Sequence, residues 1–336
     1  MTNQMECQPS GAIRKQTDGV VARILQIPEI GVLLALIVMM AVMSFLSPYF
    51  FTPINLFNIL RSMSMIGIMA VGMTLVIITG GIDLSIGSLV GVTGMLTARL
   101  LYFNTNPVLA IGAGLLFGIL LGVTNSLIIT KLRITPFIVT LGMLSIARGL
   151  TLLFALGIMG DVSINIPIKD PFISFVGGGY LGRIPFPVVI MIVLVIVADY
   201  FLRNSVLGRQ IYAVGTNEVA ARISGVNIDR IKIFVYVLMG ALCAMAGILN
   251  SGLIATAATN AGTGNELDVI AGVVIGGASL NGGRGSILGS IIGAAIMAVI
   301  KNAFVLLHLP TFVQTITIGA VIIVAVSLDS FRGQQG

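Results

Sequence analysis

The chain alternates between long apolar runs and short polar gaps. Because a helix needs about 20 apolar residues to cross the hydrocarbon core of a bilayer, each run predicts a membrane span. The pattern yields ten runs, at 30–47, 57–79, 84–103, 108–130, 134–156, 185–202, 232–254, 266–281, 286–307 and 311–328. The run at 266–281 is short and rich in glycine, and Gly80-Gly81 breaks the first hairpin, so the pattern allows nine to eleven spans. We therefore expect an all-α polytopic protein with glycine-broken or re-entrant helices.

The amino-acid composition is also that of a protein embedded in lipid. Of 336 residues, 57% are hydrophobic and 9% charged, and the mean hydropathy is +1.09. Soluble domains carry about 25% charged residues. The polar residues 1–29 show no apolar stretch followed by a cleavage site, so we interpret them as a cytoplasmic tail before a transmembrane domain at 30–329.

The distribution of basic residues predicts the orientation. With both ends inside, the cytoplasmic segments are the tail, 131–133, 203–231, the turn near Arg284 and the C-terminal end at 330–336. Twelve of the 18 Lys and Arg residues then lie inside: Arg14, Lys15, Arg23, Lys131, Arg133, Arg203, Arg209, Arg222, Arg230, Lys232, Arg284 and Arg332. The positive-inside rule therefore favours N-in, C-in, with 157–184 as an external loop.

The sequence does not indicate an enzymatic activity. The net charge of +6 comes from Lys and Arg in the gaps rather than from a basic surface, which argues against nucleic acid. No nucleotide-binding G-x-x-x-x-G-K-[ST] motif and no metalloprotease motif occur. His308 is the single histidine, and Cys7 and Cys243 are the only cysteines, so the sequence predicts no metal site, no cofactor and no disulfide framework.

Two spans carry small residues at four-residue spacing. Gly114, Gly118 and Gly122 lie in one, and Gly285, Gly289 and Gly293 lie at the start of another. In lipid such faces let helix backbones approach closely. We expect both faces to be helix-packing surfaces.

A carrier driven by a proton or sodium gradient needs ionisable groups near the middle of the membrane, and the candidates for such groups are Asp83, Arg148, Asp268 and Lys301. Asp83 precedes Leu84-Ser85, which favours an N-cap at a turn. A charge left in lipid costs roughly 2.5–3.5 kcal/mol, so Arg148 must face protein or water. A structural partner and a place beside a transport pathway remain equally open for it.

The cytoplasmic segment between the sixth and seventh runs has helical signals. Thr216 or Asn217 can cap a short helix that continues through Glu218, Ala220, Ala221 and Arg222, and Gly225 can end it before Asn227. A short helix with small residues between two spans suits a cleft of a partner protein, although a solvated connector is the alternative.

Five motifs give the chain a resemblance to a known family. They are Gly80–Ser88, Thr135–Gly142, Gly208–Asn227, Asn265–Ala271 and Ile275–Gly285. With them the chain resembles the permease subunits of bacterial ABC sugar importers of the ribose, xylose, galactofuranose and autoinducer-2 group. The likeness covers most of the chain from about residue 55 to 329, and it is weakly specific to the sugar.

The resemblance implies the partners and the location. In that family two permeases, identical or homologous, form a dimer in the inner membrane with the pathway at their interface. A periplasmic binding protein delivers the sugar, and a cytoplasmic ATPase with tandem nucleotide-binding domains supplies energy. By resemblance, the residues Thr216–Asn227 form the coupling helix that docks on the ATPase.

We place Asp83, Ser85, Asn125 and Phe137 near the translocation route, because polar or aromatic groups interrupt apolar spans there or lie on the shared motifs. The segments 80–91 and 276–289 look alike when two residues are inserted, which suggests an internal repeat. Two other functions compete with the ABC permease. They are a stand-alone ion-coupled carrier or channel, and a membrane enzyme or scaffold.

Overall fold

The computed structural model describes residues 28–156 and 165–333. Outside the described residues lie 1–27 of the predicted tail, 157–164 at the start of the external loop, and 334–336 of the predicted C-terminal end. The helices are α2 (Pro28–Leu46), α3 (Pro53–Ile78), α4 (Ile86–Tyr102), α5 (Pro107–Lys131), α6 (Pro136–Ala155), α7 (Pro171–Gly178), α8 (Phe186–Asn204), α9 (Val206–Thr216), α10 (Glu218–Ile223), α11 (Ile228–Leu253), α12 (Asn265–Ile275), α13 (Ile287–Leu306) and α14 (Thr311–Gly333).

The predicted all-helical membrane protein is confirmed, and each apolar run contains one helix. Seven helices of the described chain are long and apolar enough to cross a membrane: α2, α3, α5, α6, α8, α11 and α13. The apolar parts of α4 and α14 are shorter. With 11 residues, α12 rises about 16 Å, roughly half of a hydrocarbon core of about 30 Å.

The strands are short. β1 (Asn165–Pro167) pairs antiparallel with β4 (Thr256–Ala258), with Asn165 opposite Ala258. β2 (Tyr180–Leu181) pairs antiparallel with β3 (Ile184–Pro185). The first pair ties the segment after α6 to the segment between α11 and α12.

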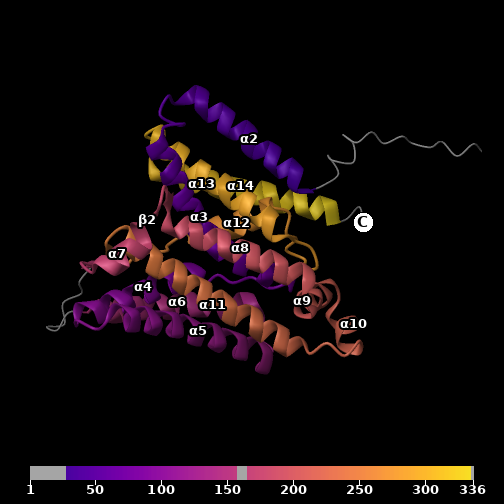
Figure 1. The fold of residues 1–336 in the computed structure, drawn as a ribbon. Helices are drawn as coiled ribbons and strands as arrows, with labels where there is room; N and C mark the ends of the chain where they lie inside the picture. Colours follow the sequence, from indigo (N-terminus) through magenta and orange to yellow (C-terminus); the bar gives the residue numbers. More distant parts are fainter. Residues whose placement is uncertain (1–27, 157–164, 334–336) are drawn as a thin grey trace, which may run out of the picture.

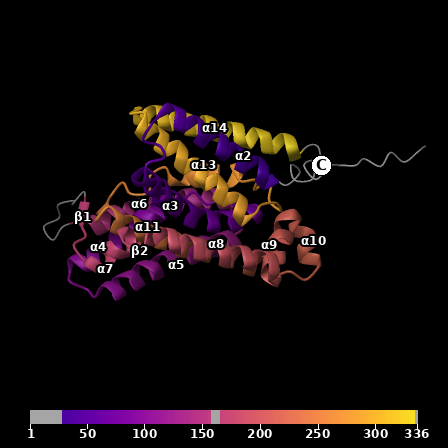
Figure 2. The ribbon, with the colours of Figure 1, turned by 45° about the horizontal axis from the view of Figure 1, so that its top comes forward.

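The helices form a layered bundle around α3 (Figure 1). α4, α5, α6 and α11 lie on one side of it, and α2, α13 and α14 lie on the other. The start of α2, the end of α14 and the pair α9–α10 all lie at one end of the bundle, while α7 lies at the opposite end (Figures 1 and 2).

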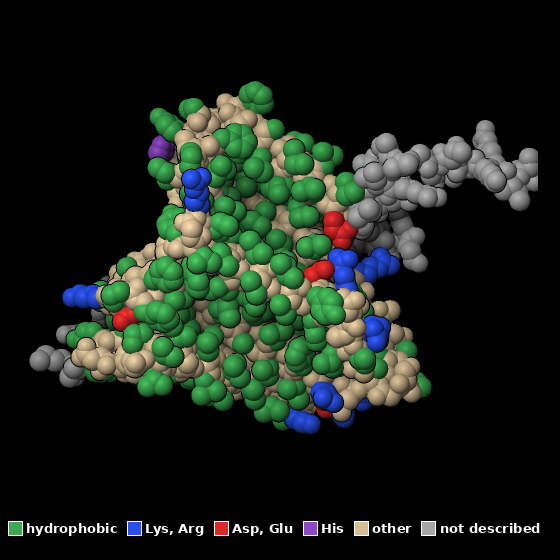
Figure 3. All heavy atoms as spheres, in the orientation of Figure 1, with side chains coloured by type: hydrophobic (Ala, Val, Ile, Leu, Met, Phe, Trp, Pro, Cys, Tyr) green, Lys and Arg blue, Asp and Glu red, His purple; other side chains and the backbone are tan. Residues whose placement is uncertain are grey.

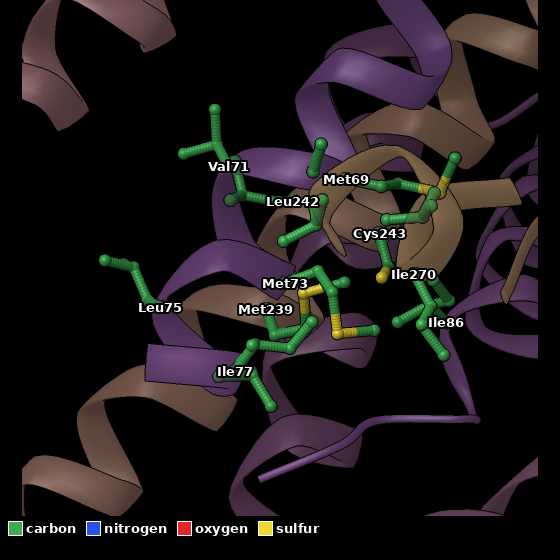
Figure 4. Close-up of a cluster of buried hydrophobic side chains, with 14 of the residues drawn as sticks. Met69, Val71, Met73, Leu75, Ile77, Ile86, Met239, Leu242, Cys243 and Ile270 are labelled. Atoms are coloured by element: carbon green, nitrogen blue, oxygen red, sulfur yellow. The ribbon is translucent and has the colours of Figure 1, made fainter. Parts of the chain in front are cut away.

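The core sits where α3 meets α11, α4 and α12. Its large side chains include Met69 and Met73 of α3, Met239 of α11 and Ile270 of α12 (Figure 4). Cys243 is buried among them as a free thiol. Methionine is flexible and polarisable, so it fills the irregular gaps between helices that cross at different angles.

The two small-residue faces pack as predicted. A Cβ on Gly118 would lie 2.6 Å from the carbonyl oxygen of Gly240, so α5 and α11 touch backbone to backbone. On the other face, a Cβ on Gly289 or Gly293 would overlap a backbone oxygen of α12. These contacts are closer than any side chain allows, so a larger residue would separate the helices.

Hydrophobic and charged side chains occupy different zones of the surface along the bundle. Hydrophobic side chains cover the middle of the molecule over α5, α8 and α11, and Lys and Arg gather at the end that carries α9 and α10 (Figure 3). Exposed side chains such as Ile196 and Val197 of α8 belong to this apolar belt. An apolar belt between polar ends is the surface that a bilayer requires.

Candidate functional site

A break in the chain separates α3 from α4. Residues Thr79–Ser85 have no regular structure, and Gly80 adopts a φ of +75°, which a residue with a side chain rarely adopts. Asp83 is 1% exposed, and its Oδ1 accepts hydrogen bonds from the backbone N–H and hydroxyl of Ser85, at 2.8 and 2.6 Å. Ser85, not Asp83, occupies the N-cap position of α4, and it makes no side-chain cap hydrogen bond.

Asn125 of α5 joins this group. Its Nδ2 donates to the Ser85 hydroxyl at 3.2 Å, whereas its Oδ1 is buried without a hydrogen-bond partner. The hydroxyl of Tyr236 on α11 is likewise buried and unpartnered, and it lies close to Gly81. The structure thus brings Asp83, Ser85 and Asn125 into one buried polar cluster with unused hydrogen-bonding capacity.

Phe137 lies at the start of α6 and is 52% exposed. Three residues further on, the Thr140 hydroxyl donates to the carbonyl of Pro136 at 2.9 Å and lies 3.3 Å from the carbonyl of Ile82, which places the start of α6 against the break. Phe137 therefore lies three residues from a side chain that contacts the break, but its own side chain is exposed and lies outside the buried polar cluster.

Arg148 has a structural partner. Its guanidinium donates from Nη1 to the carbonyls of Thr259 and Ala261, at 3.1 and 2.8 Å. Gly262 follows directly and packs against Gly87 in the first turn of α4. Arg148 thus holds the segment before α12 inside the bundle, next to the start of α4.

A cavity of about 390 Å³ lies beside the start of α12. Helices α3, α11, α12 and α13 supply its walls, which are formed by Asn58, Arg61, Ser62, Met65, Ile66, Met69, Asn250, Leu253, Asn265 and Lys301. Sequence reasoning considered Lys301 only as an isolated charge. It did not find the cavity, because α3 lies far along the chain from α11, α12 and α13, which supply the other walls.

The predicted cytoplasmic helix is present as α10. The Asn217 side chain accepts from the backbone N–H of Ala220 at 2.9 Å, and Glu218 pairs with Arg222 at 3.5 Å and with Lys232 at 2.9 Å. Gly225, with a φ of +85°, ends the helix. Asn227 caps the next helix, α11.

The outward face of α10 differs from the expected one. Ala221 is 5% exposed and packs against the permease body, whereas Val219 and Ile223 are 69% and 83% exposed. These two side chains are four residues apart and so share one face of the helix. Two apolar side chains four residues apart within a polar segment are the sequence signal that indicates this face.

α9 connects α10 to two helix breaks. A Cβ on Gly215 would overlap the carbonyl oxygen of Ile78, at the end of α3. Gly283, in the turn between α12 and α13, donates its backbone N–H to the same Ile78 oxygen at 2.8 Å. The Tyr212 hydroxyl donates to the carbonyl of Gly285 at 2.7 Å, and burial raises the pKa of Tyr212, so this donor stays protonated.

Within the described residues, no three His, Cys, Asp or Glu side chains gather in a way that could hold a metal ion. A helical membrane domain with a broken helix beside a polar cavity is the arrangement found in transport proteins. The fold and these sites define the class as a membrane permease.

The chain belongs to the family described as branched-chain amino acid transport system / permease component, which matches residues 55–326. It is 44% identical over 298 residues to the ribose import permease protein RbsC of Escherichia coli (strain K12), covering 89% of this chain and 92% of that protein. The ribose import permease protein RbsC of Bacillus subtilis (strain 168) is 39% identical over 301 residues, with coverage of 90% and 92%.

A third relative is the L-arabinose ABC transporter permease protein AraH of Azospirillum brasilense, 35% identical over 305 residues, with coverage of 91% and 88%. No solved structure matches the chain. These relatives confirm the predicted class, a multi-pass inner-membrane permease subunit of an ABC sugar importer, in which ATP is hydrolysed by a separate subunit.

Proposed function

We propose that the chain carries a monosaccharide, a pentose such as ribose, across the inner membrane. The observation that carries this proposal is the 44% identity to a ribose import permease over nearly the full length of both chains. The family description also names branched-chain amino acids. The amide, hydroxyl and cationic groups of the cavity beside α12 suit sugar hydroxyls better than an aliphatic side chain.

Energy and substrate come from partner proteins in this proposal. A periplasmic binding protein delivers the sugar, and a cytoplasmic ATPase with tandem nucleotide-binding domains drives its release. A second copy of the permease or a homologous permease completes the pathway. The residues Asp83, Ser85, Asn125 and Phe137 lie near that pathway, where the break before α4 leaves polar groups with unused hydrogen-bonding capacity.

The segment Thr216–Asn227 docks on the ATPase. Capping by Asn217, the Glu218–Arg222 and Glu218–Lys232 pairs and the exposed Val219 and Ile223 support this role, because they present a short, fixed helix with an apolar face. Of the two small residues that the sequence suggested for the contact, Ala221 faces inward, whereas Ala220 is exposed and stays part of the proposed docking surface.

The proposed topology is ten spans with both ends and 203–231 in the cytoplasm and 157–184 outside, and with α12 as a partial span. The shared position of α9–α10, the start of α2 and the end of α14 at one end of the bundle supports it (Figures 1 and 2). In intact cells, a Cys at position 217 should resist a membrane-impermeant thiol reagent added outside. Labelling of that Cys would refute the orientation.

Reconstitution into liposomes tests the function itself. We expect ribose uptake that requires the ATPase, ATP and ribose-loaded binding protein together. Uptake driven by a pH or sodium gradient without the ATPase would support the alternative, a stand-alone secondary carrier. Uptake of leucine but not ribose would place the chain with the amino acid transporters that the family description names.

A further inference from the structure

The cavity beside α12 exists because α12 is short. Asn265, its first residue, lines the cavity together with Met69 of α3, Asn250 of α11 and Lys301 of α13. The segment before α12 is held at the start of α4 by Arg148, so α12 begins inside the bundle rather than at its edge. The longer helices α3, α11 and α13 border an open pocket beside its first turn.

Residues outside the cavity hold two of its polar side chains, Lys301 and Arg61, in place. Lys301 pairs with Asp268, which is 4% exposed, so the charge of the ammonium group is balanced. Arg61 donates to the carbonyl of Gly178 at 3.3 Å, and its guanidinium lies 4.9 Å from the centre of the Tyr180 ring. Its Nε is buried without a hydrogen-bond partner.

The lining matches the two faces of a sugar ring. The amides of Asn58, Asn250 and Asn265 and the hydroxyl of Ser62 can donate to and accept from sugar hydroxyls. Met65, Ile66 and Met69 give an apolar wall for the C–H face. A volume of about 390 Å³ lies within the usual range of small-molecule sites.

We propose that this cavity holds the monosaccharide during transport and that it opens toward the outer side of the membrane. Broken helices near the middle of the membrane form the substrate sites of many transporters, and the start of α12 is such a break. The inference rests on the proposed function and adds to it the residues that contact the sugar.

Accessibility tests the cavity's position. In a variant with Cys7 and Cys243 replaced by Ser, we expect Ser62→Cys to react with a membrane-impermeant thiol reagent added outside. Ser290→Cys is the matched control, because Ser290 is 0% exposed between α3 and α13, and it should not react. Ribose-loaded binding protein should slow labelling of Ser62→Cys severalfold more than empty binding protein. Absence of labelling, or equal rates with both forms, would overturn the proposal.

Filling the cavity tests its use. We expect Ser62→Trp to lower ribose uptake at least tenfold while ribose-loaded binding protein still stimulates ATP hydrolysis. The control is Thr124→Trp, which adds the same side chain on an exposed face of α5 and should leave uptake unchanged. Parental uptake by Ser62→Trp would refute the sugar site alone. Absence of ribose uptake by the unmodified protein would refute the proposed function and this inference with it.

Discussion

The backbone N–H of Gly283 donates a hydrogen bond of 2.8 Å to the carbonyl of Ile78, and so the turn between α12 and α13 is joined to the end of α3. Gly215 of α9 packs on the same carbonyl, and a Cβ on Gly283 would lie 2.7 Å from the Thr216 hydroxyl. Three segments thus meet through backbone atoms, just before α10 begins. We infer that movement of α10 is passed through these contacts to the end of α3 and to the turn between α12 and α13.

We expect Gly215→Ala to uncouple the ATPase from transport. The added methyl overlaps the Ile78 carbonyl oxygen and must push α9 away, and overpacking of this kind costs about 1–3 kcal/mol. The ATPase should still co-purify, because α10 is unchanged, but uptake should fall. Gly112→Ala is the control, since Gly112 has no atom within 4 Å of its added Cβ. Parental uptake by Gly215→Ala would show that this contact transmits nothing.

The exposed apolar face of α10 should carry the docking to the ATPase. We expect Ile223→Asp and Val219→Asp to lower retention of the ATPase on purification by about tenfold, equivalent to roughly 1.4 kcal/mol of binding free energy. Ala221→Glu should instead disturb packing within the permease, seen as a lower melting temperature. Full retention of the ATPase by both Asp variants would place docking elsewhere, on 131–133 or the turn at Arg284.

Asp83 should tolerate loss of its charge better than loss of its acceptor. In Asp83→Asn an oxygen remains for the Ser85 N–H and hydroxyl, whereas Asp83→Leu leaves both unsatisfied at about 1–3 kcal/mol each. Thermal unfolding in detergent should rank the parent and Asp83→Asn above Asp83→Leu. Equal melting temperatures for the two variants would contradict this reading of the turn.

The proposed place of Asp83, Ser85 and Asn125 beside the pathway leads us to expect an effect on transport as well. Asp83→Asn, Ser85→Ala and Asn125→Ala should assemble with their partners but transport ribose more slowly, because they change polar groups near the route. The measurement is initial uptake at matched protein amounts. Parental rates in all three would mean that these residues only shape the turn and its packing.

We expect the Lys301–Asp268 ion pair to stabilise the folded protein, because the carboxylate of Asp268 is buried. Lys301→Met leaves the carboxylate of Asp268 buried without its partner, a change that costs about 3–5 kcal/mol. We expect Lys301→Met to lower the melting temperature and the double variant Lys301→Met/Asp268→Leu to recover most of the loss. A double variant no more stable than Lys301→Met would argue against an energetic coupling between the two residues.

Features that depend on residues close together in the chain could be predicted from the amino-acid sequence. An apolar run that is long enough to cross the bilayer forms a helix, because every backbone group in lipid must be paired internally. Asn217 and Gly225 mark the ends of α10 because capping is a local interaction. The small-residue faces were likewise readable, since four-residue spacing places glycines on one side of a helix.

Which of these features come into contact became visible only in the folded chain. In a membrane protein both the buried and the lipid-facing sides of a helix are apolar, so the pattern does not tell which side faces inward. The sides of α3, α11 and α13 that line the cavity beside α12 were therefore undetermined by the apolar pattern. The cavity beside α12 and the contact of Gly215, Gly283 and Ile78 join residues far apart in the chain, and they form because α12 starts inside the bundle and because glycines let three backbones touch.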